Sequence, residues 1–106
     1  MIVLVLALAC ATEADTGCDD AAPVTWNNFG HGFMTTYCVG CHSVENTDRR
    51  YGAPTGVDFD TEDDAIEWAA RTRVRVLEDS DMPVGGGVYA ADLELLDTWL
   101  RCELGE

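Results

Sequence analysis

Five consecutive residues, Cys38-Val39-Gly40-Cys41-His42, constrain this chain more than any other feature of its sequence. On one helical turn the two thiols lie along one side of the backbone, and the imidazole follows directly. The spacing Cys-x-x-Cys-His is the attachment pattern of c-type haem, in which each thiol adds to a vinyl group and the His binds the iron. The glycine leaves room for the backbone to pass close to a flat ring. We therefore predict one covalent haem c.

Other uses of a Cys-x-x-Cys pair fit the chain less well. A redox dithiol requires a thioredoxin-like transition from strand to helix, which the residues around Cys38 do not indicate. Half of a zinc site requires a second pair of ligands, and neither another Cys-x-x-Cys nor a pair of His follows. A structural disulfide between Cys38 and Cys41 is the remaining alternative.

Charge and length exclude several classes of protein. The chain has 106 residues, which is enough for one small domain. Six Arg, no Lys and 20 acidic residues give a formal net charge of −14. Such a chain repels phosphate backbones, so we expect no binding to nucleic acid. Docking on an anionic membrane through a basic patch is excluded for the same reason.

The amino terminus reads as an export signal. Residues 2–9 form an apolar run of eight, which is far shorter than the roughly 20 residues that span a bilayer. With Cys10 after a small residue, the segment resembles a bacterial lipoprotein signal, although no basic residue precedes it and Ala7 departs from the usual Leu. An ordinary cleaved signal and a buried first strand are the alternatives. We predict a signal over 1–9, a site of lipidation at Cys10, a polar tether over 10–23 and one domain over 24–106, located in the periplasm or another extracytoplasmic space.

The domain is expected to be all-helical. Thr25 can cap a first helix that runs into the Cys pair, and helical spacing of apolar residues predicts two more helices, over 61–78 and 90–102. Pro and Gly mark long loops over 44–60 and 80–87. Three short helices make a thin core, so a bound group is expected to fill the centre of the domain.

From residue 28 to residue 102 the sequence resembles the small monohaem cytochromes c of class I. That family has the order Cys-x-x-Cys-His, helix, Met loop, helix, and a Gly eight residues before the first Cys, which Gly30 matches. Met34 departs from the aromatic residue that the family has four residues before that Cys. The resemblance implies a cytochrome c-like fold with three to four helices around the haem, in which the first helix crosses the last one closely. Gly30 permits such an approach, and Leu96 and Trp99 offer a facing apolar surface.

The resemblance implies that Met82 is the distal ligand of the iron. Met82-Pro83 lies in a Gly-rich loop 40 residues after His42, where the family places this ligand. A thioether is a soft ligand that favours ferrous iron. Three alternatives remain. His31 is a rival ligand of the iron, or Met82 is an ordinary core residue. The third alternative is a distal site left open for a small ligand.

The resemblance also suggests groups around the haem. Pro54 corresponds to the family proline whose carbonyl accepts a hydrogen bond from the ring of His42, or is an ordinary turn residue. Arginines of the middle helix can pair with haem propionates, or with Glu67, Glu78 and nearby acids. These arginines are Arg71, Arg73 and Arg75.

Two further cysteines lie near the ends of the domain. Cys18 precedes the first helix and Cys102 ends the last, so crossing of these helices would bring the two thiols together. We predict a Cys18–Cys102 disulfide, which an oxidising compartment would preserve; two free thiols are the alternative.

The resemblance implies an exported carrier of single electrons rather than an enzyme. The acidic residues between 58 and 67 form a solvated face or steer a redox partner with a basic docking surface, and they also fit a salty habitat. Contact with a membrane is expected only through the lipid on Cys10, and the sequence does not indicate an oligomeric state. The alternatives are a haem subunit of a peroxidase or dehydrogenase, an open-site haem protein, and a haem-free, disulfide-rich lipoprotein.

Overall fold

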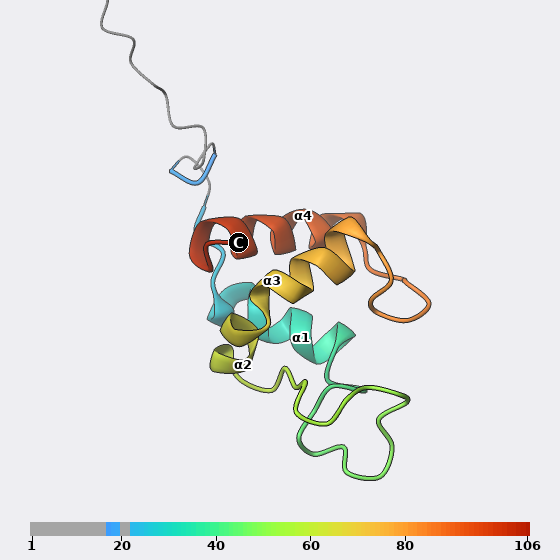
Figure 1. Cartoon of the computed structure of the whole chain (residues 1–106). Coiled ribbons are helices and arrows are strands. Elements are labelled where there is room, and N and C mark those ends of the chain that lie inside the picture. The colour runs from blue at the N-terminus through green and yellow to red at the C-terminus, as the bar shows by residue number, and fades with distance from the viewer. Residues whose placement is uncertain (1–16, 20–21) are drawn as a thin grey trace, which may run out of the picture.

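The computed structural model describes residues 17–19 and 22–106, and over these ranges it contains helices and loops but no strand (Figure 1). This confirms the predicted all-helical class. The predicted signal over 1–9 and Cys10 lie outside the described residues, as does most of the 10–23 tether. No helix in the described part is both long enough and apolar enough to cross a bilayer.

The first helical segment leads directly to the Cys pair. It consists of η2 (Trp26–Gly30), a widened helical turn, and α1 (His31–Tyr37). The predicted cap is present: the Thr25 hydroxyl accepts from the Asn28 N–H, and the Asn28 side chain accepts from the Thr25 N–H. This reciprocal pair satisfies two backbone donors at the start of the segment and so fixes where it begins.

The middle segment begins as predicted but changes course at Trp68. Thr61 and Asp64 form a second reciprocal cap, which starts α2 (Glu62–Glu67). Trp68 has φ −99° and ψ 11°, outside the helical region, and separates α2 from α3 (Ala69–Thr72) and η3 (Arg73–Glu78). The sequence predicts one continuous helix over 61–78, so the break at Trp68 departs from the prediction. It leaves the Trp68 ring half-buried against the core.

The last segment, α4 (Ala90–Thr98) and η4 (Trp99–Glu103), supplies the centre of the core. Leu96 and Leu100 are fully buried, Trp99 is 1% exposed, and α4 contacts η3. Leu96 and Trp99 are the two residues predicted to offer an apolar surface to the first helix. The other buried apolar residues are Val24, Phe33, Met34, Phe59, Ala65, Ala69 and Val76.

The first and last segments cross at Gly30. A methyl group placed on Gly30 would lie 2.5 Å from Cζ2 and 2.7 Å from Cη2 of Trp99. The Trp99 ring is itself enclosed, because the rings of Trp26 and Phe29 lie 6.2 and 6.1 Å from it. The predicted close approach at Gly30 is therefore confirmed, and the crossing tolerates only a residue without a side chain.

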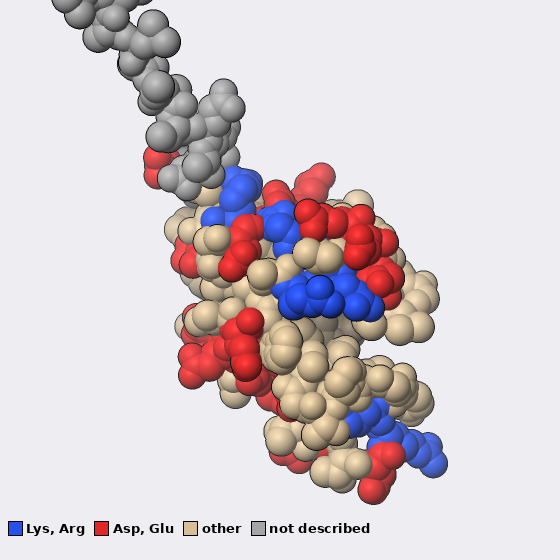
Figure 2. Space-filling model, in the orientation of Figure 1, with Lys and Arg blue, Asp and Glu red and all other residues tan. Residues whose placement is uncertain are grey.

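Arginines of η3 are engaged in ion pairs with acids on other segments. Arg73 binds Asp97 of α4 at 2.8 Å and also the carbonyl of Glu106, and Arg75 binds Asp81 at 2.8 Å. Neither partner is Glu67 or Glu78, but Asp81 is one of the nearby acids that the prediction also named. Figure 2 shows the basic side chains over the α3–η3 segment, bordered by acidic side chains of α4. Arg71 is exposed, and we find no ion pair for it in the described part of the chain.

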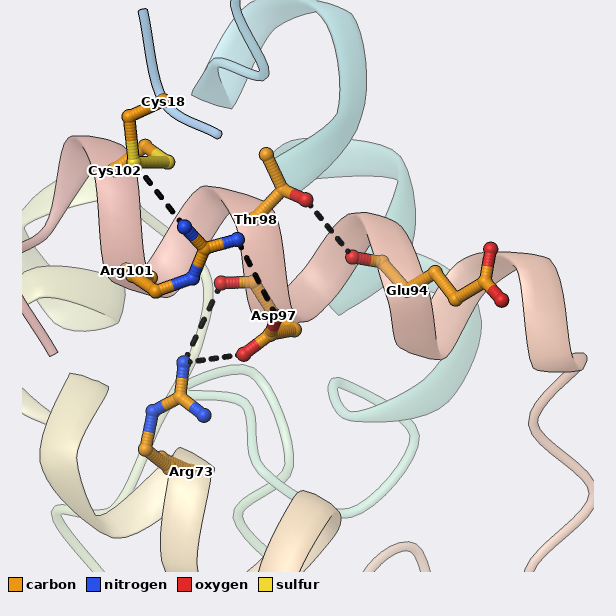
Figure 3. The surroundings of a disulfide bond; sticks show 7 residues. All are labelled: Cys18, Arg73, Glu94, Asp97, Thr98, Arg101 and Cys102. Atoms are coloured by element: carbon orange, nitrogen blue, oxygen red, sulfur yellow. Dashed lines mark hydrogen bonds and ion pairs between the residues drawn. A yellow bond between two sulfur atoms is a disulfide. The ribbon is translucent and has the colours of Figure 1, made fainter. Parts of the chain in front are cut away.

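The predicted disulfide is present between Cys18 and Cys102, whose Cα atoms are 5.5 Å apart (Figure 3). It ties the segment before the first helix to the end of η4, across 84 residues of chain. Arg101 donates to the Cys18 sulfur at 3.3 Å and pairs with Asp97 at 3.6 Å. The bridge therefore adds to the Gly30 crossing as a second link between the ends of the domain.

Removal of this bridge by the double substitution Cys18→Ser and Cys102→Ser is expected to lower the free energy of unfolding by about 4 kcal/mol. The cost arises because the unfolded chain regains the freedom of a long closed loop. Guanidinium unfolding of the variant measures it, and reduction of the wild type should reproduce the loss. Equal unfolding midpoints for the variant and the oxidised wild type would contradict the expected role.

Candidate functional site

The predicted attachment residues lie on the turn that follows α1. The Cys38 N–H donates to the Met34 carbonyl at 2.9 Å, which continues the helix, and the His42 N–H donates to the Cys38 carbonyl at 2.9 Å. This turn brings the two thiols and the imidazole together. Cys38 and Cys41 are half-buried and are not bonded to each other. The described structure therefore gives no support to a Cys38–Cys41 disulfide.

The ring of His42 is fixed from two sides. Its Nδ1 lies 2.9 Å from the carbonyl oxygen of Val57, and because a carbonyl only accepts, Nδ1 carries the proton. The Phe59 ring meets the imidazole edge-on at 5.4 Å, and the Phe59 N–H donates to the His42 carbonyl at 3.0 Å. This tautomer leaves Nε2 unprotonated, which is the form in which an imidazole binds a metal.

Val57, and not Pro54, accepts the hydrogen bond from His42. The interpretation of Pro54 as this acceptor is therefore corrected: its carbonyl accepts from the Arg50 guanidinium at 2.8 Å and from the Val57 N–H at 3.2 Å. Pro54 shapes the loop, three residues before the carbonyl that reaches the imidazole. The spacing of proline from the Cys pair could not show which carbonyl of the loop points inward.

Arg50 organises the same loop and was missed by the sequence reasoning. Its guanidinium donates to the Val57 carbonyl at 3.1 Å and pairs with Asp58 at 2.8 Å, and its side chain is only 12% exposed. It also donates to backbone carbonyls on both sides of the loop, those of Ser43, Asn46, Ala53 and Pro54. The adjacent Arg49 is exposed in the structure. Because the two arginines are neighbours in the same loop, the sequence alone does not show which one turns inward.

The half-buried Cys38 thiol has lost much of its solvation. Loss of solvation raises the pKa of Cys38 to about 12. Very little thiolate is then present at neutral pH, and the thiolate is the form that attacks disulfides and binds zinc. Among the described residues, no three His, Cys, Asp or Glu side chains lie close enough together to bind a metal ion. Neither the redox dithiol nor the zinc alternative gains support.

Met82 lies on the loop between η3 and α4, half-buried against the core. Its side chain lines an open cavity with Val76 and Leu93. The loop is fastened by Arg75, whose carbonyl accepts from the N–H groups of Asp81 and Met82 at 3.0 and 3.2 Å, while its side chain binds the Asp81 carboxylate. This arginine therefore positions the start of the loop, a role the sequence did not indicate.

His31, the rival ligand, begins α1, seven residues before Cys38. Its side chain is exposed, and its ring lies 5.3 Å from the ring of Trp26. Met34, the other methionine of the domain, is 1% exposed within the core. Met82 is half-buried and lines a cavity, but none of Cys38, Cys41 and His42 lines that cavity.

Tyr37 connects the attachment turn to α4. Its hydroxyl donates to the Asp92 carboxylate at 2.7 Å, and it directly precedes Cys38. This hydrogen bond raises the pKa of Tyr37, because ionisation would remove the bond and leave a phenolate beside a carboxylate; desolvation raises it further. The folded Tyr37 therefore keeps its proton, and this bond, to a higher pH than an ordinary tyrosine would.

Stability is expected to depend on Tyr37 below pH 10 and to lose that contribution above it. The unfolded tyrosine ionises near its ordinary pKa of about 10 while the folded one retains its proton, so folding becomes less favourable as pH rises. The measurement is urea unfolding of the wild type and Tyr37→Phe from pH 7 to pH 11. The difference in the free energy of unfolding between the wild type and Tyr37→Phe should narrow at alkaline pH. Tyr51→Phe, at an exposed position, should have the same free energy of unfolding as the wild type at every pH. A gap independent of pH would refute this assignment.

No family model, curated protein or solved structure matches this chain. What can be inferred about its function beyond the helical class therefore rests on its own residues.

Proposed function

We propose that this protein is an exported monohaem c-type cytochrome that carries single electrons between redox partners. The observation that carries the proposal is the turn after α1, where two unbridged thiols lie next to an imidazole whose Nδ1 is already engaged. Covalent haem attachment needs both thiols free and Nε2 available. The cytochrome c-like arrangement of the helices belongs to the same proposal.

The residues present fit a haem. Cys38 and Cys41 would hold the ring, and His42 and Met82 would bind the iron. A further observation supports the fit: the indole N–H of Trp68 is buried and has no acceptor among the described residues. A buried donor without a partner costs about 1–3 kcal/mol, and a haem propionate is an acceptor that would remove this cost. The small core is explained in the same way, since the ring would complete it.

Bound haem supplies one-electron chemistry between ferric and ferrous iron. The chain's own residues orient and shield it. Val57 fixes the tautomer and plane of His42, the Phe59 ring packs nearly perpendicular to the imidazole, and Arg75 fastens the loop that carries Met82. If His42 and Met82 both bind the iron, no substrate would need to reach the metal, and no nucleophile or general base would be required.

The proposed partners are redox proteins with a basic docking surface. The net charge of −14 and the acidic side chains bordering α4 in Figure 2 would steer such partners at low ionic strength. Export, with or without lipid on Cys10, places this exchange outside the cytoplasm. The alternative is a haem subunit of a redox enzyme or an open-site haem protein. In an open-site protein Met82 would not bind the iron. An enzyme subunit would either leave Met82 off the iron or dock tightly on a catalytic chain.

A potentiometric titration, followed by absorption, tests the carrier against this alternative. A carrier should titrate as a single one-electron couple and should not bind carbon monoxide when reduced at neutral pH, because Met82 would already be bound to the iron. Rapid binding of carbon monoxide to the folded, reduced protein would favour the open-site alternative and contradict the carrier.

A further inference from the structure

We infer that Arg50 is a positioning residue that tunes the iron through His42, by sharing the Val57 carbonyl with the imidazole. The inference rests on the proposed function, because it assigns to Arg50 control over the reduction potential of the haem that His42 would bind. Arg50 would not touch the iron or the ring. It would act through the hydrogen bond that His42 makes.

One oxygen atom joins the two side chains. The Val57 carbonyl lies 2.9 Å from His42 Nδ1 and 3.1 Å from the guanidinium of Arg50. The same guanidinium nitrogen binds Asp58 at 2.8 Å, and the Arg50 and Asp58 side chains are 12% and 17% exposed. The group is thus less exposed than the other ion pairs, although both side chains line an open cavity, and bulk solvent screens its charges less than those of the surface pairs.

This arrangement affects how strongly the imidazole donates electrons to iron. A carbonyl that accepts from the ring N–H makes the imidazole more basic and so favours the ferric state. A guanidinium on the same oxygen draws electron density away and weakens that effect. Arg50 therefore favours ferrous iron both through the shared oxygen and through its positive charge. Asp58 opposes it by neutralising that charge.

The loop contacts give Arg50 a structural role as well, so the test must separate the two. Loosening of the loop would expose the site to water and shift the reduction potentials of Arg50→Gln and Asp58→Asn in the same direction, because each variant loses the ion pair. Tuning through the carbonyl shifts the two reduction potentials in opposite directions, because Asp58→Asn leaves Arg50 as an uncompensated cation on the shared oxygen. The sign of the second shift is the deciding observation.

The experiment measures midpoint potential, haem content and thermal unfolding of the full-length protein matured with haem, for the wild type, Arg50→Gln, Asp58→Asn and the control Arg49→Gln. Arg49→Gln removes the same charge from an exposed neighbouring position. We expect Arg50→Gln to lower the potential by about 59 mV, a tenfold shift toward ferric iron, Asp58→Asn to raise it, and Arg49→Gln to change it little. The proton resonance of His42 Nδ1–H in the reduced protein should move in Arg50→Gln and stay in place in Arg49→Gln.

Equal potentials in Arg50→Gln and Arg49→Gln, or a lowered potential in Asp58→Asn, would overturn the inference and leave the proposed function intact. If Arg50→Gln does not fold, the sign of the shift in Asp58→Asn decides alone. A wild type that takes up no haem would instead overturn the proposed function. Haem content therefore distinguishes the two failures.

Discussion

Replacement of Gly30 by alanine is expected to lower the free energy of unfolding by about 3 kcal/mol, a large part of the roughly 5–15 kcal/mol that stabilises a domain. The added methyl group would lie 2.5 Å from the Trp99 ring, well inside van der Waals contact. The ring cannot move aside, because it is 1% exposed and packs against Trp26 and Phe29. The first and last helices would have to separate, and the core would open along their crossing.

Gly32→Ala is the matched control for this substitution. Gly32 lies two residues further along, in α1, and a methyl group there meets no atom within 4 Å. Alanine is favoured over glycine inside a helix by about 1 kcal/mol, so Gly32→Ala should be neutral or stabilising. Urea unfolding of both variants measures the difference. If Gly30→Ala proved as stable as Gly32→Ala, the helices would not cross at this residue.

If the protein is the proposed cytochrome, replacement of Met82 by leucine is expected to remove the distal ligand and leave the haem attached. Leucine has a similar volume but no sulfur, so packing of the loop against the core changes little. The ferric protein should lose the weak red band of iron bound to a thioether, the reduced protein should bind carbon monoxide, and the reduction potential should fall by more than 59 mV, a tenfold shift toward ferric iron.

Met34→Leu makes the same chemical change inside the core. Met34 is 1% exposed within the core and is not the proposed ligand, so this variant should keep the red band and lose less than about 1.5 kcal/mol of stability. Absorption spectra of the two variants at equal haem content decide the assignment. Persistence of the band in Met82→Leu would show that another residue binds the iron.

Much of the fold could be predicted because it depends on local signals. Thr25 and Thr61 are each followed three residues later by a side chain that completes a reciprocal cap, so both helix starts were predicted. The crossing at Gly30 and the Cys18–Cys102 bridge followed from one further idea, that the first and last helices lie together.

The surroundings of His42 could not be predicted in the same way. Which carbonyl accepts from Nδ1 depends on the path of a 17-residue loop, residues 44–60, which has no periodic pattern to fix it. Arg50 and Arg49 are chemically identical in sequence, and only the folded loop shows that Arg50 turns inward. The break at Trp68 could not be predicted, because no Gly or Pro marks it in the sequence.

The central claim is that Cys38, Cys41 and His42 bind a covalent haem. The most direct test is the absorption spectrum of the wild type produced with the c-type maturation machinery, ferric and then reduced with dithionite, before and after extraction with acid acetone. We expect a sharp low-spin c-type spectrum that stays with the protein through extraction, because thioether bonds to both cysteines hold the ring. A protein without absorbing haem, or one whose haem passes into the acetone, would contradict the claim.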